Sequence, residues 1–266
     1  MANETEQFKK RIHELSETSY TNSQYLFTDF LNEAELSDVL SIAGNASEEI
    51  STGKTVICSA FPSGITIYGG HTMSTRCMIR FGSEEAFAYD EPFPISIVHI
   101  FPRLAKFADT FTHRDFLGAI LNLGIDRKVT GDILTDGTQA WLFAEEKMAE
   151  FIKDNLDQVK HTHIICEIVD DIPKEMQVHT EHLEFQVQSE RIDAIAAQIV
   201  KLSRSKVLEL FRTQKIFVNG RTMENPSFQP KSGDMISIRG FGKVRYLGTT
   251  RLTRKGKCNI AIEKFI

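Results

Sequence analysis

The sequence predicts an α+β protein built from three modules, and three observations support this prediction. The 266 residues, 41% hydrophobic and 25% charged, suffice for two or three small globular domains. Helix and strand patterns in the middle of the chain follow one another in the order βαββαβ. Basic residues are concentrated at the C-terminal end. We therefore expect modules at residues 1–91, 92–180 and 186–266.

The N-terminal module, of α/β type, should begin with two helices. The first is predicted by the spacing of three apolar residues, Phe8, Ile12 and Leu15. A linker is expected near Ser19–Ser23. The second helix is predicted over Glu33–Ala43, because apolar residues recur there at helical spacing and Asn32 is a residue type suited to the N-cap.

The rest of this module should be a sheet. Three β-rich stretches are predicted, Thr55–Phe61, Ile65–Tyr68 and Cys77–Phe81. The run Pro62-Ser63-Gly64 is typical of a turn between the first two. Two consecutive glycines, Gly69 and Gly70, indicate a sharp turn or a close approach of backbone. The proline-containing segment 84–94 indicates a module boundary.

The central module has the clearest pattern. Strands and helices are predicted in alternation at Ile95–Phe101, 112–123, Gly131–Leu134, Gln139–Ala144, Glu145–Leu156 and His163–Val169. The helices should bury two apolar faces, Phe116, Leu117, Ile120 and Leu121 in one and Met148, Phe151, Ile152 and Leu156 in the other. The order βαββαβ is ferredoxin-like, as in RNA-recognition (RRM-like) modules and many enzymes. The sequence contains no RNP-type aromatic run for stacking bases, so any RNA contact here is expected to be of another kind.

The net charge of −5 conceals an asymmetry. Residues 186–266 contain 16 Lys and Arg against 6 Asp and Glu, a net charge of +10. Residues 1–185 contain 15 against 30, a net charge of −15. Clustered basic residues attract polyanions, and phosphate binding releases counterions. The alternative is a basic surface that serves only solubility. The asymmetry favours a nucleic-acid partner at the C-terminal end.

The C-terminal module is predicted to start with a helix over Glu190–Leu202 and a second helix opened by Ser203 as N-cap. Arg204 and Lys206 would lie in the first turn, where free backbone N–H groups favour phosphate. Strands and turns follow, in the order Lys215–Val218, Asn219-Gly220, Ser232–Asp234 and Met235–Arg239.

This stretch resembles the S-four (alpha-L) RNA-binding domain. The resemblance rests on several matched groups at the right separations, Arg191–Asp193, Ser203–Ser205, Lys215–Gly220 and Lys231–Asp234. It implies an S-four-type module with a C-terminal β extension that binds structured RNA. The residues that would bind RNA are Arg191, Ser203, Arg204, Lys206, Lys215, Asn219, Gly220, Arg221, Lys231, Arg239, Lys243 and Arg245. The need for a left-handed turn accounts for at least half of the reason why Asn219 and Gly220 occur at these positions. Asp193 is interpreted as a helix N-terminal charge.

The rest of the chain resembles the bacterial YlmH family. The matching segments are His113–Ala119, Leu123–Arg127, Gly131–Ile133, Ser237–Lys243 and Arg254–Lys257. One departure lies in residues 69–76, where the family tends to have a Glu-Arg pair and this chain has Thr75-Arg76. The role of that pair is therefore not carried over, although a surface role for the loop is still expected.

The resemblance implies a cytoplasmic, non-enzymatic RNA-binding factor that needs no cofactor. Its partners would be rRNA and tRNA on the large ribosomal subunit, in rescue or quality control of stalled translation, and the family is also linked to cell division. One alternative is an RNA-modifying enzyme that uses its basic domain as pseudouridine synthases do. Another is a division factor whose acidic body binds a protein. The sequence indicates no oligomeric state.

A smaller basic set lies on the acidic body, His113, Arg114, Arg127 and Lys128. It would be an auxiliary RNA contact or a structural network of Arg127 with Asp132 or Asp126, and the two interpretations are evenly matched.

Catalytic and metal sites are weakly indicated. Scattered histidines, His161 and His163 on a strand and His179 and His182 with Glu181 in a loop or turn, are usually structural or solvated. Asp126, Asp132 and Asp136 are conceivable nucleophiles or bases only if the chain modifies RNA. Gly118 and Gly124 form no phosphate-binding loop. We therefore expect neither a catalytic residue nor a metal site.

The remaining signals concern the cell compartment. The four cysteines, Cys58, Cys77, Cys166 and Cys258, are far apart and form no C-x-x-C pair, which fits a reduced cytoplasm. Residues 1–11 have no apolar signal-peptide core, and no run of about eighteen apolar residues predicts a membrane span.

Overall fold

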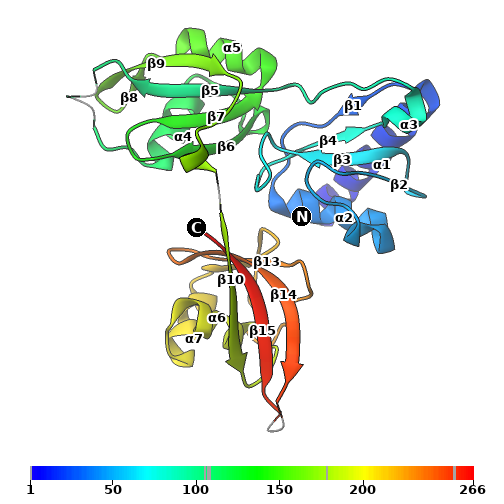
Figure 1. Cartoon of the computed structure of the whole chain (residues 1–266), viewed down its shortest axis with the longest axis vertical. Helices are drawn as coiled ribbons and strands as arrows, with labels where there is room; N and C mark the ends of the chain where they lie inside the picture. The colour runs from blue at the N-terminus through cyan, green and yellow to red at the C-terminus, as the bar shows by residue number, and fades with distance from the viewer. Residues whose placement is uncertain (1, 105, 107–108, 178, 254–255) are drawn as a thin grey trace. The chain divides into compact units, whose positions relative to one another are not determined.

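Three sheets and the helices that cover them form the mixed α+β fold (Figure 1). The structure is a computed structural model, and it describes residues 2–104, 106, 109–177, 179–253 and 256–266. The chain divides into two compact units, Met1–Gln177 and Val178–Ile266. Two sheets lie in the first unit and one in the second, so the boundary expected at residues 91–92 falls inside the first unit and stays a prediction.

The N-terminal sheet has the strand order β1-β4-β3-β2. Its strands are β1 (Leu26–Phe27), β2 (Thr55–Cys58), β3 (Phe61–Tyr68) and β4 (Met78–Phe81). The helical segments are α1 (Ala2–Asn22), α2 (Glu33–Ala43), η1 (Gly44–Glu48) and α3 (Glu84–Phe87). Asn32 caps α2 as expected, because its side chain accepts hydrogen bonds from the backbone N–H groups of Ala34 and Glu35. The core includes Ile12 of α1, Val39 of α2 and Phe61 and Phe81 of the sheet.

Two local expectations for this sheet are wrong. The predicted linker at Ser19–Ser23 largely belongs to α1, because Ser19 is buried and its hydroxyl donates to the Gln24 carbonyl (2.8 Å). Pro62-Ser63-Gly64 is part of β3 rather than a turn. The β2–β3 register shifts between Val56 and Cys58, and a strand irregularity of this kind accommodates a proline and a glycine at φ 97°.

The central sheet has the strand order β6-β7-β5-β9-β8. Along the chain its elements are β5 (Ile95–Pro102), α4 (His113–Leu121), η3 (Arg127–Val129), β6 (Thr130–Thr135), β7 (Ala140–Glu145), α5 (Glu146–Asn155), β8 (Gln158–Val159), β9 (Thr162–Val169) and η4 (Lys174–Met176). Helices α4 and α5 cover one face through Phe116, Ile120 and Ile152, which pack on Val98 and Ile100 of β5. The predicted βαββαβ order is present, with the short strand β8 as an addition before β9, and the hairpin at Asp136-Gly137 agrees with the predicted one.

Both helices bury a narrower face than predicted. The side chain of Leu121 is 39% exposed, because α4 ends there, and that of Phe151 is 41% exposed. Helix α5 packs instead through Ala149 and Ile152.

The second unit contains one six-stranded sheet in the order β10-β15-β14-β13-β11-β12. Its elements are β10 (Thr180–Val187), α6 (Ile192–Val200), α7 (Arg204–Arg212), β11 (Ile216–Val218), β12 (Arg221–Thr222), β13 (Met235–Ile238), β14 (Gly242–Leu252) and β15 (Cys258–Phe265). Helices α6 and α7 pack on one face of this sheet through Ile192, Ile195, Val207 and Phe211. The core formed there aligns the two helix N-termini that carry the predicted basic residues.

Strand β10 was not expected. It pairs with β15 over its whole length, and Leu183, Phe185 and Val187 point to the core at strand spacing. The alternation is hidden in the sequence because the opposite face consists of polar residues. Glu181 and His182 therefore lie in a strand and not in a loop or turn. None of the helices in the described ranges combines the length and the apolar character that a bilayer span requires.

Candidate nucleic-acid interface

A buried carboxylate at the start of α6 holds two of the predicted RNA-binding arginines. Asp193 is 1% exposed and accepts hydrogen bonds from Arg204 (2.7 and 2.9 Å) and from Arg191 (both 3.2 Å). Burial acts to raise the pKa of Asp193, but the hydrogen bonds from Arg204 and Arg191 outweigh it and hold the pKa below its ordinary value. Asp193 does lie in the first turn of α6, as expected, and in addition it joins the two helices through this double ion pair.

The ion pairs leave both arginines open to a ligand. The side chain of Arg204 is 55% exposed and that of Arg191 is 37% exposed. A guanidinium has five N–H donors, and Asp193 accepts from two on each arginine. The carboxylate thus fixes the orientation of the planar groups, while other donors can bind a phosphate in the geometry that arginine favours.

Helix α7 begins beside this cluster. Ser203 occupies the N-cap position, as predicted, but its hydroxyl lies 3.1 Å from the hydroxyl of Ser205 rather than capping the backbone. Arg204 and Lys206 are exposed in the first turn. Backbone N–H groups at a helix start favour anions, so the two cations and the helix end act in the same direction.

A second group of predicted residues lies at the turn between β11 and β12. Asn219 and Gly220 have φ values of 49° and 72°, which confirms the left-handed turn. The Asn219 amide donates to Asp234 (2.8 Å) and accepts from the backbone N–H of Met235 (2.9 Å), so Asn219 ties this turn to the next. Its RNA contact remains a prediction. The basic residues at these two turns are exposed, Arg221 and Lys231.

A third group lies on the sheet face away from α6 and α7. Strand alternation places Lys243 and Arg245 opposite the buried Val244 and Tyr246, and Arg239 follows β13 beside Lys215, whose carbonyl accepts its N–H (2.8 Å). The guanidinium of Arg239 lies 5.4 Å from the ring centre of Phe217, and that of Arg245 lies 5.7 Å from Phe265 and 3.0 Å from the Glu263 carboxylate. The structure therefore divides the predicted residues between two faces of the unit.

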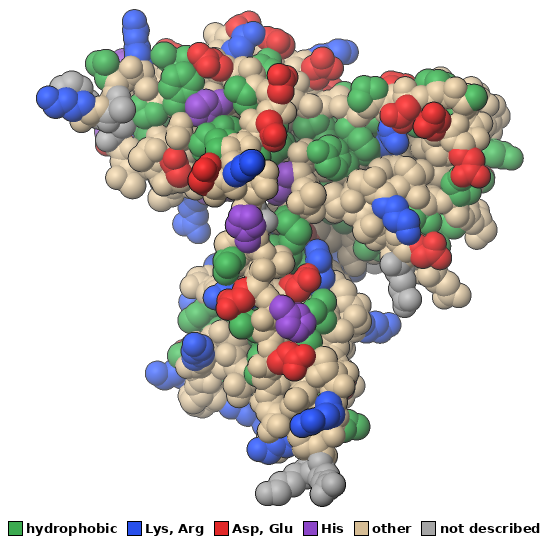
Figure 2. Space-filling view, in the orientation of Figure 1, with side chains coloured by type: hydrophobic (Ala, Val, Ile, Leu, Met, Phe, Trp, Pro, Cys, Tyr) green, Lys and Arg blue, Asp and Glu red, His purple; other side chains and the backbone are tan. Residues whose placement is uncertain are grey.

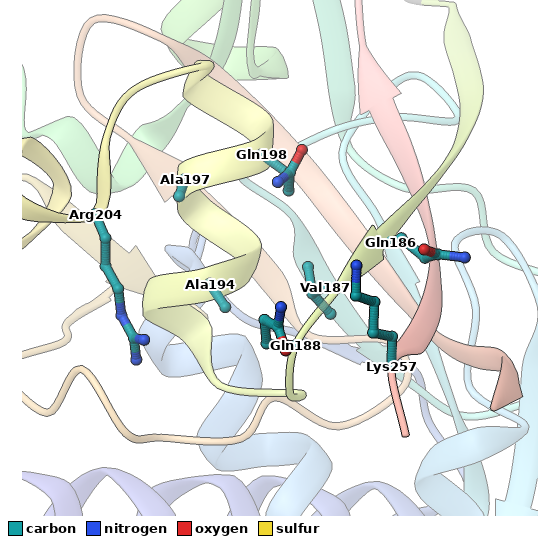
Figure 3. A pocket seen from close by; sticks show the side chains of 8 residues that line it. All are labelled: Gln186, Val187, Gln188, Ala194, Ala197, Gln198, Arg204 and Lys257. Carbon is teal, nitrogen blue, oxygen red and sulfur yellow. The ribbon is translucent and has the colours of Figure 1, made fainter. Parts of the chain in front are cut away.

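A shallow cavity of about 260 Å³ adjoins the arginine cluster (Figure 3). Its lining residues are Gln186, Val187, Gln188, Ala194, Ala197, Gln198, Arg204 and Lys257. Figure 3 shows the two small alanines on α6 and Lys257 reaching in from another segment. The small side chains of Ala194 and Ala197 leave room for a ligand, and the cations Arg204 and Lys257 favour an anionic one. Of the matched segment Arg254–Lys257, residues 254 and 255 lie outside the described residues.

The auxiliary basic set of the first unit has a different environment. Arg127 donates to the carbonyls of Thr130 (2.7 Å) and Gly131 (2.8 Å), and not to Asp132 or Asp126 as the structural alternative supposed. Burial, with Arg76 nearby, lowers the pKa of Arg127 to about 10. His113, Arg114 and Lys128 are exposed, and their RNA contacts remain a prediction.

The glycine loop at residues 69–76 is mostly half-buried and makes structural contacts, and its surface role stays a prediction. Arg76 donates to the carbonyls of Phe30 (2.8 Å), Arg127 (3.1 Å) and Thr130 (3.0 Å), which connects the two sheets of the first unit. Thr75, at the departure from the family pattern, donates through its backbone N–H (2.6 Å) and hydroxyl (2.7 Å) to Asp132. Burial acts to raise the pKa of Asp132, but hydrogen bonds from His71 and Thr75 lower it below its ordinary value.

The other titratable candidates have structural contacts. Asp126 accepts from the Lys128 N–H (2.9 Å), and Asp136 accepts from the N–H groups of Thr138 (2.8 Å) and Gln139 (2.9 Å). Within the described ranges, no three His, Cys, Asp or Glu side chains are grouped to hold a metal ion. Burial raises the pKa of the Cys77 and Cys166 thiols to about 12.

Charge is distributed unequally over the two units. On the face in Figure 2, acidic side chains are numerous over the first unit, and basic ones rim the second. Sequence reasoning found the basic residues but missed the Asp193 pairs and the aromatic partners of Arg239 and Arg245. The Asp193–Arg204 pair spans a turn between two helices, and no local pattern signals it.

Known proteins agree with the motifs. A family model described as the putative RNA-binding domain in YlmH matches residues 89–172. The ribosome-associated protein quality control protein P2 of Bacillus subtilis (strain 168) is 28% identical over 208 residues, which cover 76% of this chain and 78% of that protein. A solved structure, the cell division protein ylmH from Streptococcus pneumoniae, is 18% identical with a TM-score of 0.45, covering 63% of this chain and 92% of that chain. The chain is therefore similar to YlmH proteins, through the family model over residues 89–172 and through the Bacillus subtilis relative.

Proposed function

We propose that the protein is a non-enzymatic, cytoplasmic RNA-binding factor that binds rRNA or tRNA on the large ribosomal subunit during rescue or quality control of stalled translation. The observation that carries this proposal is the pair of arginines oriented by buried Asp193 beside the start of α7. The name of the Bacillus subtilis relative supports the ribosomal setting. The second unit would then be an S-four-type module, and the central one a ferredoxin-like module.

The chemistry of the second unit suits structured RNA. A-form RNA is recognised mainly through its shape, phosphates and 2′-hydroxyls. Two guanidinium groups fixed by a carboxylate offer donors at a defined separation, and Lys206 and the helix start add positive charge. Residues 186–266 carry a net charge of +10, so association should be strongly dependent on salt.

Crosslinking in cells followed by sequencing of the bound RNA tests the proposal. Lys206→Glu reverses an exposed charge without touching Asp193, and Lys147→Glu makes the same change at an exposed position of α5 in the first unit. We expect the wild type and Lys147→Glu to enrich a large-subunit rRNA site or tRNA, and Lys206→Glu to lose that enrichment. A wild-type protein that enriches no RNA would contradict the proposal.

A further inference from the structure

A row of three aromatic rings crosses the face of the central sheet that α4 and α5 leave uncovered. The ring of His99 is stacked on Trp141, with centres 4.8 Å apart and planes 5° apart, and lies 4.7 Å from the ring of Phe101. His99 and Trp141 are paired across β5 and β7. The Nε2 atom of His99 lies 2.8 Å from the Gln139 amide oxygen, which fixes the ring orientation. The sequence showed no such platform because its rings come from two strands.

One end of this face is covered and the other is open. Ile172 and Met176, from the segment after β9, pack on Trp141 and Phe143, and Trp141 is only 4% exposed. Towards the other end, Phe101 is half-buried and the neighbouring Ile165 of β9 is 38% exposed. The row thus begins in a rigid core and ends at solvent, where another ring could extend it.

Positive charge lies at the open end. Arg103 follows Phe101 by two residues and is exposed, and its backbone N–H donates to the His163 carbonyl (2.9 Å). His163 is exposed on β9, two residues before Ile165. Two carboxylates share this face, Glu167 opposite His99 and Glu145 opposite Ile95, and both lie farther from the open end than Arg103.

We propose that this stacking surface, formed by His99, Phe101, Ile165, Arg103 and His163, binds single-stranded RNA. A base would stack on Phe101, and Arg103 would bind the adjoining phosphate. Aromatic platforms with a cationic border bind single strands in this way, whereas the bases of a duplex are already stacked and cannot reach a sheet face. The inference rests on the proposed function. The second unit would bind a structured part of the RNA, and the central module would bind a single-stranded part of the same molecule.

The test combines one charge variant and one ring variant with a matched control. Phe101→Leu removes the stacking ring and Arg103→Glu reverses an exposed charge. Phe151→Leu makes the same aromatic change at an exposed position of α5, on the opposite layer of the module. Binding of a labelled 12-nucleotide oligoadenylate and of a stem-loop RNA would be measured for the full chain. The only tryptophan of the chain, Trp141, reports on this face through its fluorescence.

We expect Phe101→Leu to weaken oligoadenylate binding by about fivefold or more, the typical effect of losing one stacked base. Arg103→Glu should weaken it as well, and oligoadenylate should change the Trp141 emission. Phe151→Leu should leave all three readouts at wild-type values. Because Arg103 is exposed, its variant decides the outcome if Phe101→Leu does not fold.

The contrary results separate this inference from the proposed function. Unchanged oligoadenylate affinity in Phe101→Leu and Arg103→Glu, with stem-loop binding weakened in Lys206→Glu, would overturn the stacking surface and leave the proposed function standing. Wild-type protein that binds neither RNA would overturn both. A protein that binds this face while the affinity for both RNAs stays unchanged would also contradict the inference.

Discussion

Replacement of Asp193 by asparagine should lower the free energy of unfolding by about 2 kcal/mol and weaken RNA binding at the same time. The asparagine amide carries no negative charge, so it cannot form the ion pairs with Arg191 and Arg204. The buried side chain at position 193 then lacks hydrogen-bond partners that match it. Both arginines are partly exposed, so the effect should be smaller than the 3–5 kcal/mol typical of a fully buried ion pair. Chemical denaturation measures the first effect, and titration with a stem-loop RNA measures the second.

The same variant makes a prediction about pH. Because the pKa of Asp193 in the folded protein lies below its ordinary value, its ion pairs stabilise the fold above about pH 4, and this contribution disappears as the pH falls through the folded-state pKa. The stability difference between wild type and Asp193→Asn should therefore shrink in acid. Glu209→Gln, at an exposed position of α7, is the control and should change little. Equal stability of wild type and Asp193→Asn at pH 7 would refute the buried ion pair.

Substitution of Gly70 by alanine should destabilise the first unit by about 3 kcal/mol. A Cβ at Gly70 would lie 2.2 Å from Cδ1 of Phe143, which is fully buried, and the residue has φ 101°, where only glycine is comfortable. Thermal unfolding measures the effect.

Gly118 provides the matched control for that variant. It lies inside α4, and a Cβ there would meet nothing within 4 Å. Gly118→Ala should therefore stabilise the protein by roughly 0.5–1 kcal/mol, the usual gain in a helix interior. Stability that does not fall in Gly70→Ala would show that the glycine loop is not packed on the central sheet.

The strongly patterned elements could be predicted from the sequence. Helix α2, with its Asn32 cap, and the hairpin at Asp136-Gly137 follow from local signals that tertiary packing does not override. In the second unit, the left-handed turn at Asn219-Gly220 occurs as expected, and Ser203 occupies the N-cap position without a side-chain hydrogen bond to the backbone. These are short-range features, and each depends on a few neighbouring residues.

Long-range pairings could not be predicted. Strand β10 exists because β15, far along the chain, pairs with it, and Pro62 lies within a strand because the pairing with β2 is irregular there. The Asp193–Arg204 pair and the His99–Trp141 stack likewise join separate elements. For the candidate site, sequence reasoning thus identified the basic residues, while their division between two faces of the second unit follows only from the sheet.

The dependence of RNA affinity on salt tests the central claim that the second unit binds RNA through its phosphates. The binding constant of a stem-loop RNA would be measured across a range of salt concentrations for wild type, Lys206→Glu and the control Lys147→Glu. We predict a steep linear fall of log K with log salt for wild type and control, and a slope smaller by roughly 0.7–0.9 for each phosphate that Lys206→Glu no longer neutralises. Identical slopes and affinities for the three proteins would contradict the account.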